Sequence, residues 1–447
     1  MIKIYDTMTR SLRDFVPLTE NVVNMYVCGP TVYNYIHIGN ARSAVAFDTI
    51  RRYFEYCGYT VNYISNFTDV DDKIIKAANE AGISTKELSD KFIAAFMEDT
   101  GQLGIKPATQ NPRVINYMDE IIAFVSTLVD KGFAYVSEGD VYFRVAKSNN
   151  YAKLANKTLE DLEIGASGRT DAETDRKEDP LDFALWKAAK EGEISWESPW
   201  GPGRPGWHIE CSVMATEILG DTIDIHGGGA DLEFPHHTNE IAQSEAKTGK
   251  TFANYWMHNG FVNVDNEKMS KSLGNFVTVH DMLKTVDGQV LRFFLATQQY
   301  RKPINFTEKA IHDAEVNLKY LKNTHSLPLT EQVNQAELQT YLDAFQEAMD
   351  DDFNTANGVT VLFDMAKWIN SGNYDQTVKD AFEKMLQVFG IVFEEEVLDE
   401  DIEKLIEERQ AARANKDFAT ADRIRDELAA QGIKLLDTKE GVRWTRD

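Results

Sequence analysis

Hydrophobic positions in the first 67 residues follow the order strand, helix, strand. An apolar run at 22–27 stops at residues 28–30, Cys-Gly-Pro, which is typical of a buried strand that ends in a turn. Apolar residues recur at helical spacing over about 41–54, and a second apolar run covers 61–67. This order predicts an α/β fold with a parallel, doubly wound sheet, whose ligands lie at the carboxyl ends of the strands.

The rest of the chain adds an insertion and further sheet elements. Residues of about 120–205 combine a helical pattern with a short strand-like segment at 141–145 and a Gly-, Pro- and Trp-rich exit. We interpret them as an insertion in the sheet domain. The sheet resumes at 222–226, and a helix follows over 238–248. Gly249 is placed to end that helix.

Helical pattern dominates from about residue 308 onward. An acidic run at 394–401 indicates a solvated boundary. Beyond it, one more helix is expected with Gly432 at its end, followed by a short hairpin-like tail; the apolar positions of that helix are Phe418, Ala421, Ile424 and Leu428. The expected architecture is a Rossmann-like sheet with an insertion, then a helical domain and a small C-terminal α+β domain.

Composition excludes several classes of protein. Hydrophobic residues make up 43% of the 447 residues, yet no apolar stretch reaches the ~18 residues of a membrane span. The first residues lack a basic region followed by an apolar run, which argues against secretion. Three cysteines do not form a disulfide framework in a chain of this length. We therefore expect a cytoplasmic protein without a membrane partner. A monomer is our expectation, although the sequence does not reveal the oligomeric state.

The net charge of −25 argues at first sight against a nucleic-acid partner. Its distribution changes that picture. Residues 331–400 hold 16 acidic side chains against three lysines, whereas residues 401–447 hold 11 acidic and 10 basic side chains. More than half of the negative excess therefore lies in one helical stretch, and the remaining surface is free to carry a local basic groove.

Two short motifs could bind nucleotide phosphates. Residues 37–40, His-Ile-Gly-Asn, precede the first long helix, where free backbone N–H groups and the helix dipole favour phosphate. Gly39 would allow a nucleotide to approach closely, and His37 can donate to phosphate oxygens. Residues 268–272, Lys-Met-Ser-Lys-Ser, supply cations and hydroxyls that can close over a triphosphate. Either motif alone is commonly an ordinary loop, but the pair in this order is much more specific.

Together these motifs resemble the two signatures of class I aminoacyl-tRNA synthetases. The segments around them closely resemble the cysteinyl-tRNA synthetases over essentially the whole chain; these segments are 26–33, 66–73, 206–211, 226–232 and 417–444. The resemblance implies an enzyme that activates L-cysteine with ATP to cysteinyl-adenylate and transfers the cysteinyl group to tRNA(Cys). It also implies that Mg²⁺ accompanies ATP.

The same resemblance sets the expected domain boundaries. A split catalytic domain would comprise 1–120 and 206–250, with an inserted connective domain at 121–205. A stem-contact region that carries the second signature would follow, then a helical domain and an anticodon-binding domain; these three are 251–307, 308–392 and 393–447.

For the phosphate groups, the resemblance implies catalytic and ATP-binding roles for His37, Asn40, Lys268 and Lys271. Asn40 is a departure, because the family's first signature often ends in a second histidine. Asparagine donates a neutral hydrogen bond but cannot become cationic. We therefore expect reduced or re-routed phosphate contact at this position, and a role for it as an acid catalyst is in doubt.

The resemblance also implies a zinc site, with ligands at Cys28, Cys211, His236 and Glu240. The residues support this in part, because His236 and Glu240 are four apart on an expected helix and can point the same way. His237 is three residues from Glu240 and could share that face. Spacing does not choose between the two histidines, whereas the family pattern favours His236. A lone cysteine is more often a core residue than a ligand.

Zinc would matter because it binds a thiolate far better than a hydroxyl. Our hypothesis is that the substrate thiol approaches as an additional ligand, with zinc becoming five-coordinate or Glu240 loosening, and that this selects cysteine over serine. A purely structural zinc is the strongest alternative, because four protein ligands normally close the shell.

Other contacts follow from the resemblance alone. Gly29 and Thr68 would contact the polar end of the amino acid, and Trp207 would form a wall of the pocket. Asp231 would accept hydrogen bonds from ribose hydroxyls, next to an adenosine site lined by His226, Gly227, Gly228 and Gly229. In the C-terminal domain, Trp444 is a candidate for stacking on the anticodon, beside Arg409, Arg413, Arg423, Arg425 and Arg443. Core packing is the alternative for both tryptophans.

Two other functions remain open at this point. An enzyme that joins cysteine to a small amine would use the same adenylate, but such relatives lack a full C-terminal RNA domain. A noncatalytic RNA-binding paralogue would not need His37, Lys268, Lys271 or the four presumed zinc ligands. Both are therefore less well supported than a synthetase.

Overall fold

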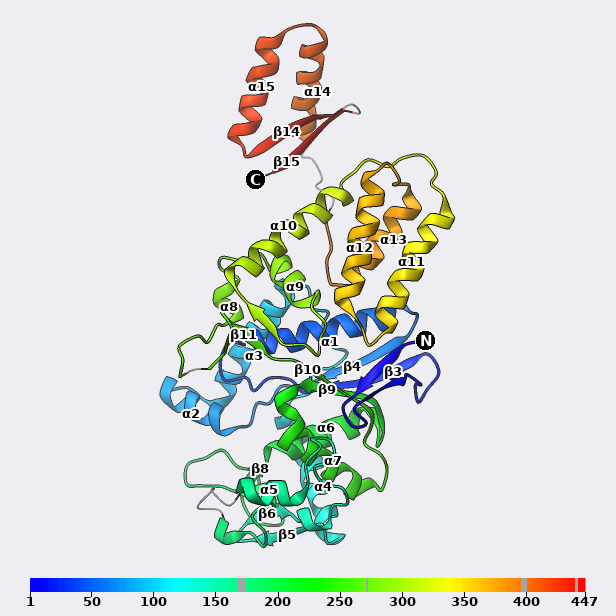
Figure 1. Cartoon of the computed structure of the whole chain (residues 1–447). Coiled ribbons are helices and arrows are strands. Elements are labelled where there is room, and N and C mark those ends of the chain that lie inside the picture. The colour runs from blue at the N-terminus through cyan, green and yellow to red at the C-terminus, as the bar shows by residue number, and fades with distance from the viewer. Residues whose placement is uncertain (167–173, 271, 395–399, 439–440, 447) are drawn as a thin grey trace. The chain divides into compact units, whose positions relative to one another are not determined.

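A parallel sheet of four strands forms the framework of residues 1–392 (Figure 1). All of its strand pairs are parallel, and their order is β10 (Ala253–Asn259), β9 (Ile223–Gly229), β3 (Val22–Val27) and β4 (Thr60–Ser65). Because parallel strands point the same way, Cys28, Asn66 and the turn after Gly229 lie at one edge of the sheet. The expected α/β class is confirmed.

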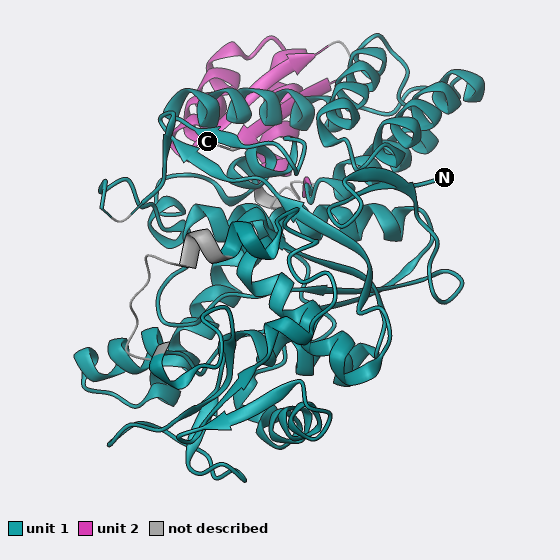
Figure 2. Cartoon of the chain, turned by 60° about the horizontal axis from the view of Figure 1, so that its bottom comes forward, with its two compact units in different colours: residues 1–392 teal, residues 393–447 magenta. Residues whose placement is uncertain are grey.

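Contacts within the chain divide it into two units, residues 1–392 and 393–447 (Figure 2). Each unit has its own hydrophobic core. The computed structural model describes residues 1–166, 174–270, 272–394, 400–438 and 441–446. None of the described helices is long and apolar enough to cross a membrane.

Helices cover both sides of the sheet. α1 (Ile38–Tyr56) connects β3 to β4 on one side, whereas α6 (Trp207–Leu219) and α7 (Thr238–Thr248) lie on the other (Figure 1). α1 begins earlier than the sequence pattern indicates, because the side chain of His37 caps it. α7 has the expected bounds, and Gly249 ends it in the left-handed conformation at φ 71°.

The insertion between β4 and α6 carries an antiparallel sheet of its own. The order of that sheet is β5 (Ala134–Ser137), β6 (Asp140–Phe143), β7 (Phe183–Ala188) and β8 (Gly203–Pro205). The helices of this stretch are α2 (Asp72–Ala81), α3 (Thr85–Gln102), α4 (Met118–Asp130) and α5 (Leu159–Ala166). Shorter helical turns lie at Val114–Tyr117, Val145–Lys147, Thr174–Arg176, Ala230–Leu232 and Glu233–His237.

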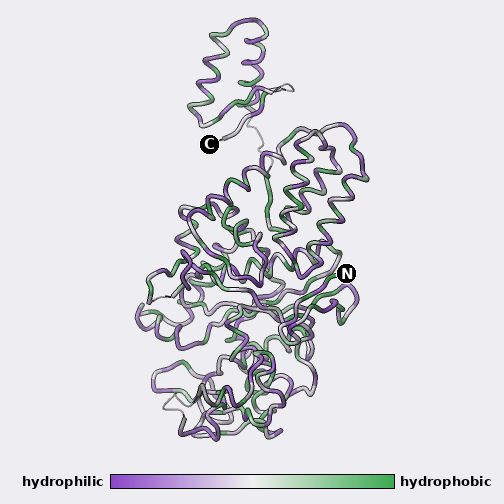
Figure 3. Tube along the Cα trace, in the orientation of Figure 1, coloured by the Kyte–Doolittle hydropathy of each residue, from purple (hydrophilic) through white to green (hydrophobic). Residues whose placement is uncertain are grey.

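Short elements lead from the sheet into the helical part of the first unit. The strands β11 (Val262–Val264), β12 (Glu267–Lys268) and β13 (Ile304–Phe306) follow β10. Two further strands, β1 (Lys3–Asp6) and β2 (Ser11–Asp14), precede the sheet and pair with each other. The helices are α8 (Val279–Met282), α9 (Gly288–Ala296), α10 (Glu308–His325), α11 (Gln335–Asp350), α12 (Thr355–Asn370) and α13 (Gln376–Val388). Hydrophobic and hydrophilic residues alternate along α11 to α13 (Figure 3), and each helix buries its apolar face, for example through Phe345, Leu362 and Phe382.

The second unit is small and mixed in structure. It contains α14 (Glu400–Ala414), α15 (Phe418–Ala430) and an antiparallel hairpin of β14 (Ile433–Thr438) with β15 (Gly441–Arg446). Ile402, Ile406, Ile424, Leu428 and Ile433 form its core, and Trp444 packs against them. The helix and the hairpin-like tail expected from the sequence are both present.

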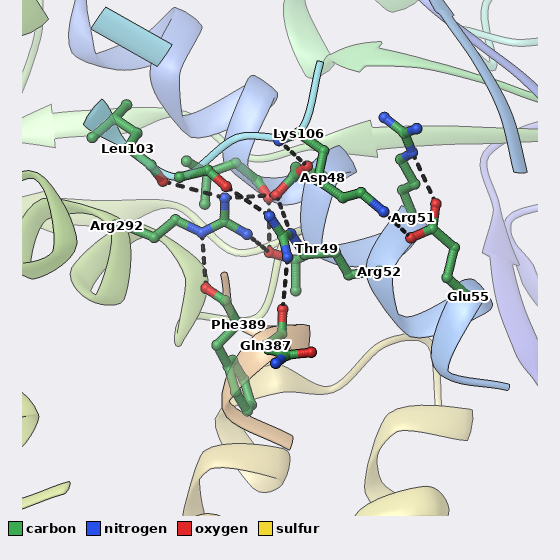
Figure 4. A network of polar contacts seen from close by, with 12 residues as sticks. Asp48, Thr49, Arg51, Arg52, Glu55, Leu103, Lys106, Arg292, Gln387 and Phe389 are labelled. Carbon is green, nitrogen blue, oxygen red and sulfur yellow. Dashed lines mark hydrogen bonds and ion pairs between the residues drawn. The ribbon is translucent and has the colours of Figure 1, made fainter. Parts of the chain in front are cut away.

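A buried charged network ties α1 to the helical part (Figure 4). The Asp48 carboxylate lies 2.6 Å from Arg292 and 2.8 Å from Arg52. Arg292 also donates to the carbonyls of Leu103 and Phe389, and Arg52 donates to those of Gly104 and Gln387. Both guanidinium groups therefore join the end of α3 to the end of α13, with one carboxylate between them.

Removal of the Asp48 carboxylate tests how much this network contributes to the free energy of unfolding. Asp48→Ala leaves Arg292, which is wholly buried, without its counter-charge, so we expect a loss of about 3–5 kcal/mol in the free energy of unfolding in urea. Asp313→Ala is the control, because Asp313 pairs with Lys309 on the surface and should cost less than ~1 kcal/mol. Equal losses would contradict the central role of the network.

Stability should also depend on pH through this carboxylate. Burial alone would raise the pKa of Asp48, but the charges of Arg292 and Arg52 lower it below its usual value. A lowered pKa in the folded state means that the stabilisation is fully present above the ordinary pKa of aspartate and is lost as pH falls through the folded-state value. The pH profile of Asp48→Asn should lack that part of the acid destabilisation.

Candidate active site and metal centre

A cavity of about 650 Å³ opens where β3 and β9 end. Its wall includes the connection from β3 to α1, the turn after β9, and the residues that follow β10. Among the residues singled out from the sequence, those that line it are Cys28, Gly29, His37, Gly39, Asn40, Trp207, Gly229, Asp231 and Lys268. The strand ends therefore bring together side chains that are up to 240 positions apart in the chain.

His37 and Asn40 cap the first helix reciprocally. The Asn40 backbone N–H donates to His37 Nδ1 at 3.2 Å, and the His37 backbone N–H donates to Asn40 Oδ1, also at 3.2 Å. This is a capping box. A Cβ atom on Gly39 would lie 2.9 Å from the His37 ring, so a side chain there would displace the histidine. Asn40 thus has a structural role that the sequence pattern did not indicate.

The second phosphate motif borders the same cavity. Lys268, Met269 and Ser270 line it, and the Lys268 ammonium lies 5.4 Å from the centre of the Phe261 ring. The Ser270 N–H donates to Asn275 Oδ1 at 2.8 Å, and Asn275 donates back to the Lys268 carbonyl at 3.2 Å. Lys271 lies outside the described residues.

Cys28 and three other potential metal ligands, Cys211, His236 and Glu240, lie close together. The Cys28 sulfur lies 3.7 Å from Cys211 Sγ, 3.4 Å from His236 Nε2 and 3.4 Å from Glu240 Oε1. One ligand atom from each of the four residues lies within 4.8 Å of all the others. Cys211, His236 and Glu240 are buried, whereas Cys28 is half-buried and lines the cavity. Two sulfurs, an imidazole and a carboxylate in this arrangement fit a zinc ion.

A second set of potential ligands overlaps the first. It consists of Cys28, His226, His237 and Glu240, whose ligand atoms also lie within 4.8 Å of one another. His237 Nε2 lies 3.4 Å from Cys28 Sγ, and its other ring nitrogen is 2.8 Å from His258 Nε2. A neighbouring histidine supports the imidazole in each set, since His208 lies 2.9 Å from His236. The first set differs in containing Cys211, a second soft ligand.

Charges inside the cluster shift the pKa values of its members. The hydrogen bond from Cys28 lowers the pKa of Cys211 to about 6, so Cys211 is a thiolate at neutral pH. Burial alone would lower the pKa of His236, but the charge of Glu240 and the hydrogen bonds with Cys211 and Glu240 raise it to about 10. The metal-free cluster therefore holds a proton on His236, which a metal ion has to displace.

The residues expected around the amino acid lie close to the cluster. Trp207 is 42% exposed and stacks on His236, with ring centres 4.2 Å apart. Gly29 packs so tightly on the next strand end that a Cβ atom would lie 1.6 Å from the Asn66 carbonyl oxygen. Thr68 is 2% exposed and is not among the residues that line the cavity.

Only some of the residues expected to bind adenosine line the cavity. Gly229 and Asp231 line the cavity, whereas His226, Gly227 and Gly228 do not. His226 is wholly buried, and its Nε2 lies 2.5 Å from Glu240 Oε2. It therefore supports Glu240 directly, a role that the sequence analysis did not assign to it.

Sequence analysis missed two further contributors. Asn66 is buried, and its Oδ1 accepts hydrogen bonds from the Gly29 N–H and the Tyr26 hydroxyl, both at 3.0 Å. His208 contacts His236 as described above. Both residues lie inside the segments 66–73 and 206–211 that carry the family resemblance, but nothing in the spacing distinguishes them from their neighbours.

Most of the C-terminal arginines have acidic partners. Arg409 and Arg413 both pair with Asp437, and Arg423 and Arg425 pair with acidic residues of their own helix. These four arginines are therefore partly neutralised within the second unit.

The chain is similar in sequence and in fold to proteins of a known class. A parallel sheet with the first signature where the chain passes from β3 into α1, and the second signature bordering the same cavity, is typical of a class I aminoacyl-tRNA synthetase. The family model described as the tRNA synthetases class I (C) catalytic domain matches residues 14–316. The DALR domain matches 344–394, and the cysteinyl-tRNA ligase anticodon binding domain matches 395–444. A solved Mycobacterium tuberculosis methionyl-tRNA synthetase in complex with methionyl-adenylate has the same fold, with a TM-score of 0.60 and 15% identity over 82% of this chain and 89% of that one.

Relatives of high sequence identity identify the family within this class of synthetases. The cysteine–tRNA ligase of Streptococcus thermophilus (strain CNRZ 1066) is 96% identical over the full length of both chains. Those of Streptococcus agalactiae serotype III (strain NEM316) and Streptococcus pyogenes serotype M6 (strain ATCC BAA-946 / MGAS10394) are 82% and 83% identical, again over the full length of both chains. The chain belongs to the cysteine–tRNA ligase family.

The capping box can be tested at Asn40. Asn40→Ala removes the acceptor for the His37 N–H, and we expect it to lower the free energy of unfolding in urea by about 1 kcal/mol. Asn40→Asp keeps the acceptor oxygen and adds a charge that the helix N-terminus favours, so its stability should match or exceed that of the wild type. Two equally destabilised variants would show that the side-chain acceptor is not what matters.

Proposed function

We propose that the chain ligates cysteine to tRNA(Cys) at the expense of ATP, and that both activation and transfer take place in the cavity described above. The observation that carries this proposal is the meeting of two kinds of group at one cavity. The signature residues His37 and Lys268 line it, and so does Cys28, which opens the Cys28–Cys211–His236–Glu240 cluster toward it.

In the first step, the cysteine carboxylate attacks the α-phosphorus of ATP. The carboxylate is already a nucleophile, so no general base is needed, and positioning with electrostatic stabilisation accounts for the catalysis. His37 and Lys271 stabilise the phosphate transition state as charge develops on pyrophosphate, and Lys268 supports the loop of the second motif. Asn40 contributes a neutral hydrogen bond and holds the helix end that presents His37.

In the second step, the terminal ribose hydroxyl of the transfer RNA takes the cysteinyl group. Asp231 accepts from the ribose hydroxyls of the adenylate, beside Gly229, with Gly227 and Gly228 behind the cavity wall in β9. Gly29 holds the polar end of the amino acid, and Trp207 covers it. Thr68 lies behind the cavity wall and supports Gly29 through Asn66, which donates to the Thr68 hydroxyl at 3.2 Å and accepts from the Gly29 N–H at 3.0 Å. In the second unit, Trp444 stacks on a base of the anticodon.

Cys28, Cys211, His236 and Glu240 would hold zinc. When bound, zinc supplies a preference for a thiolate over a hydroxyl, and this preference would separate cysteine from serine. The half-buried position of Cys28 supports selection over a purely structural site, because the cluster reaches the cavity on that side. Trp207, stacked on His236, closes the space that the substrate side chain would enter.

We further propose that Mg²⁺ arrives with ATP and that the chain acts as a cytoplasmic monomer. Within the described residues, the only groups of ligating side chains close enough for a metal are the two that share Cys28 and Glu240. Mg²⁺ is commonly held through substrate phosphates with few protein ligands, so the lack of a carboxylate cage in that part of the chain is compatible with the proposal.

Zinc content after dialysis against a chelator should separate the two ligand sets. We expect His236→Ala to lower zinc affinity by more than the ~10–100-fold typical of a supporting residue, and His237→Ala to stay within that range. A larger loss for His237→Ala would assign the metal to the second set. Because His236 has to give up a proton, zinc affinity of the wild type should rise as pH increases toward about 10.

Amino-acid selection provides a direct test of the function. With zinc-loaded protein, cysteine-dependent exchange of pyrophosphate into ATP should exceed the serine-dependent rate by more than the ~10–200-fold that packing differences provide. Nearly equal rates for cysteine and serine would contradict selection at the metal.

The division of labour between the two units can be tested by truncation after Val392, where the units separate. The cavity lies entirely within the first unit, so we expect pyrophosphate exchange to be retained. Charging of tRNA(Cys) should fall by orders of magnitude, because the anticodon-binding domain is lost. A parallel loss of both activities would contradict this division.

A further inference from the structure

The cavity wall contains a lysine that the steps above do not use. Three lysines line the cavity within the described residues, namely Lys73, Lys106 and Lys268. The Lys106 ammonium pairs with Glu55 at 2.5 Å, and Lys268 belongs to the phosphate motif. Lys73 is exposed, and in the part of the chain that the structure describes no ion pair neutralises it. A cation without a counter-charge in a substrate cavity indicates an anionic ligand.

Nearby carboxylates are already engaged elsewhere. Asp71 caps α2, and its Oδ1 accepts from the Lys73 backbone N–H at 2.8 Å. Asp72 forms an ion pair with Arg204 of the inserted sheet. The side chain of Lys73 instead reaches the aromatic ring of Tyr33, with its ammonium 5.5 Å from the ring centre.

Backbone pairing fixes where this lysine and this ring lie. The Val32 N–H donates to the Thr68 carbonyl and the Thr68 N–H donates to the Pro30 carbonyl, both at 3.1 Å. The loop that starts at Cys28 and the loop that follows β4 are therefore joined side by side. Tyr33 and Lys73 both line the cavity. Tyr33 belongs to the loop that carries Cys28, and Lys73 lies in the first turn of α2, directly after the loop that carries Thr68.

The chemistry of the reaction leaves one anion without a partner. This step depends on the proposed function. The triphosphate meets His37 and Lys268, and the cysteine carboxylate is consumed as the nucleophile. The cysteine ammonium would be repelled by a lysine. What remains is the phosphodiester next to the terminal nucleotide of the RNA, which has to enter the cavity for the second step.

We propose that Lys73 and Tyr33 form a binding site for the single-stranded 3′ end of the transfer RNA. The Lys73 ammonium contacts the last phosphodiester, and the Tyr33 ring stacks on a terminal base. Single-stranded RNA ends are bound in this way, by aromatic faces for the bases and by cations for the phosphates. The site lies beside the loop of Cys28, so the terminal ribose is delivered to the end of the cavity where the cysteinyl group would lie.

Single-turnover transfer from preformed enzyme-bound cysteinyl-adenylate to a tRNA(Cys) transcript tests this site. For Lys73→Met we expect the RNA concentration at half-maximal rate to rise roughly tenfold, as for the loss of one charged contact. The salt dependence should also weaken, with a slope lower by about one. Cysteine-dependent pyrophosphate exchange should stay within about twofold of the wild type, and Lys73→Arg should restore transfer.

Two controls keep the result specific. Lys76→Met removes an exposed lysine of the same helix, whose ammonium lies 4.0 Å from Glu80, and it should change nothing. With a transcript that lacks its last two nucleotides, Lys73→Met and the wild type should bind equally well, because the contact is absent in both cases. Tyr33→Leu should behave as Lys73→Met does, but with an unchanged salt slope.

Three results would overturn the inference. Pyrophosphate exchange that falls as far as transfer would assign Lys73 to ATP or cysteine, and an unchanged transfer reaction would make it a surface lysine. A Lys73→Met effect that persists with the shortened transcript would assign it to another part of the RNA. A wild-type chain without cysteine-dependent exchange would overturn the proposed function as well, whereas the first three results leave that function intact.

Discussion

The parallel pairing of β3 with β9 and β4 decides where the chemistry of this chain can lie. Val27 pairs with Gly227 on one side and with Ser65 on the other, so the residues after each strand start from the same edge. Cys28 takes its position from β3, and Glu240 takes its position from α7, which follows β9. No single segment carries the cluster or the cavity. Both exist because three distant strands end in register.

The same edge concentrates buried charge, which normally destabilises a protein unless it is compensated. Glu240 is wholly buried, with His226 against one oxygen and His236 against the other. Cys211 beside it is a thiolate at neutral pH. In the metal-free cluster the proton on His236 supplies the compensation, and a divalent cation would supply more. The second, overlapping ligand set follows from this crowding, because Cys28 and Glu240 are shared by both.

Sequence patterns predicted the regular elements better than the site. β3 and α7 have the bounds expected, because an apolar run and a glycine mark their ends. β4 stops at Ser65 and not at residue 67, since Asn66 turns inward to accept from Gly29 and Tyr26. His226 was expected at adenosine, but its ring lies beneath Glu240, and a strand residue's neighbours across the sheet are not visible in its own sequence. Spacing could not link Cys211 to Cys28; the family resemblance supplied that pair.

Local charge resolves the conflict between a net charge of −25 and an RNA substrate. Exposed charges separated by more than about 8–10 Å in physiological salt are largely screened, so the net charge of the whole chain does not decide what a phosphate meets inside the cavity. What acts there is the set of groups in the wall. Glu55 neutralises Lys106. Lys73 in α2 and Lys268 in β12 also border the cavity, and among the described residues neither forms an ion pair. A phosphate in the cavity thus meets individual lysines of the wall, and composition alone could not have revealed their positions.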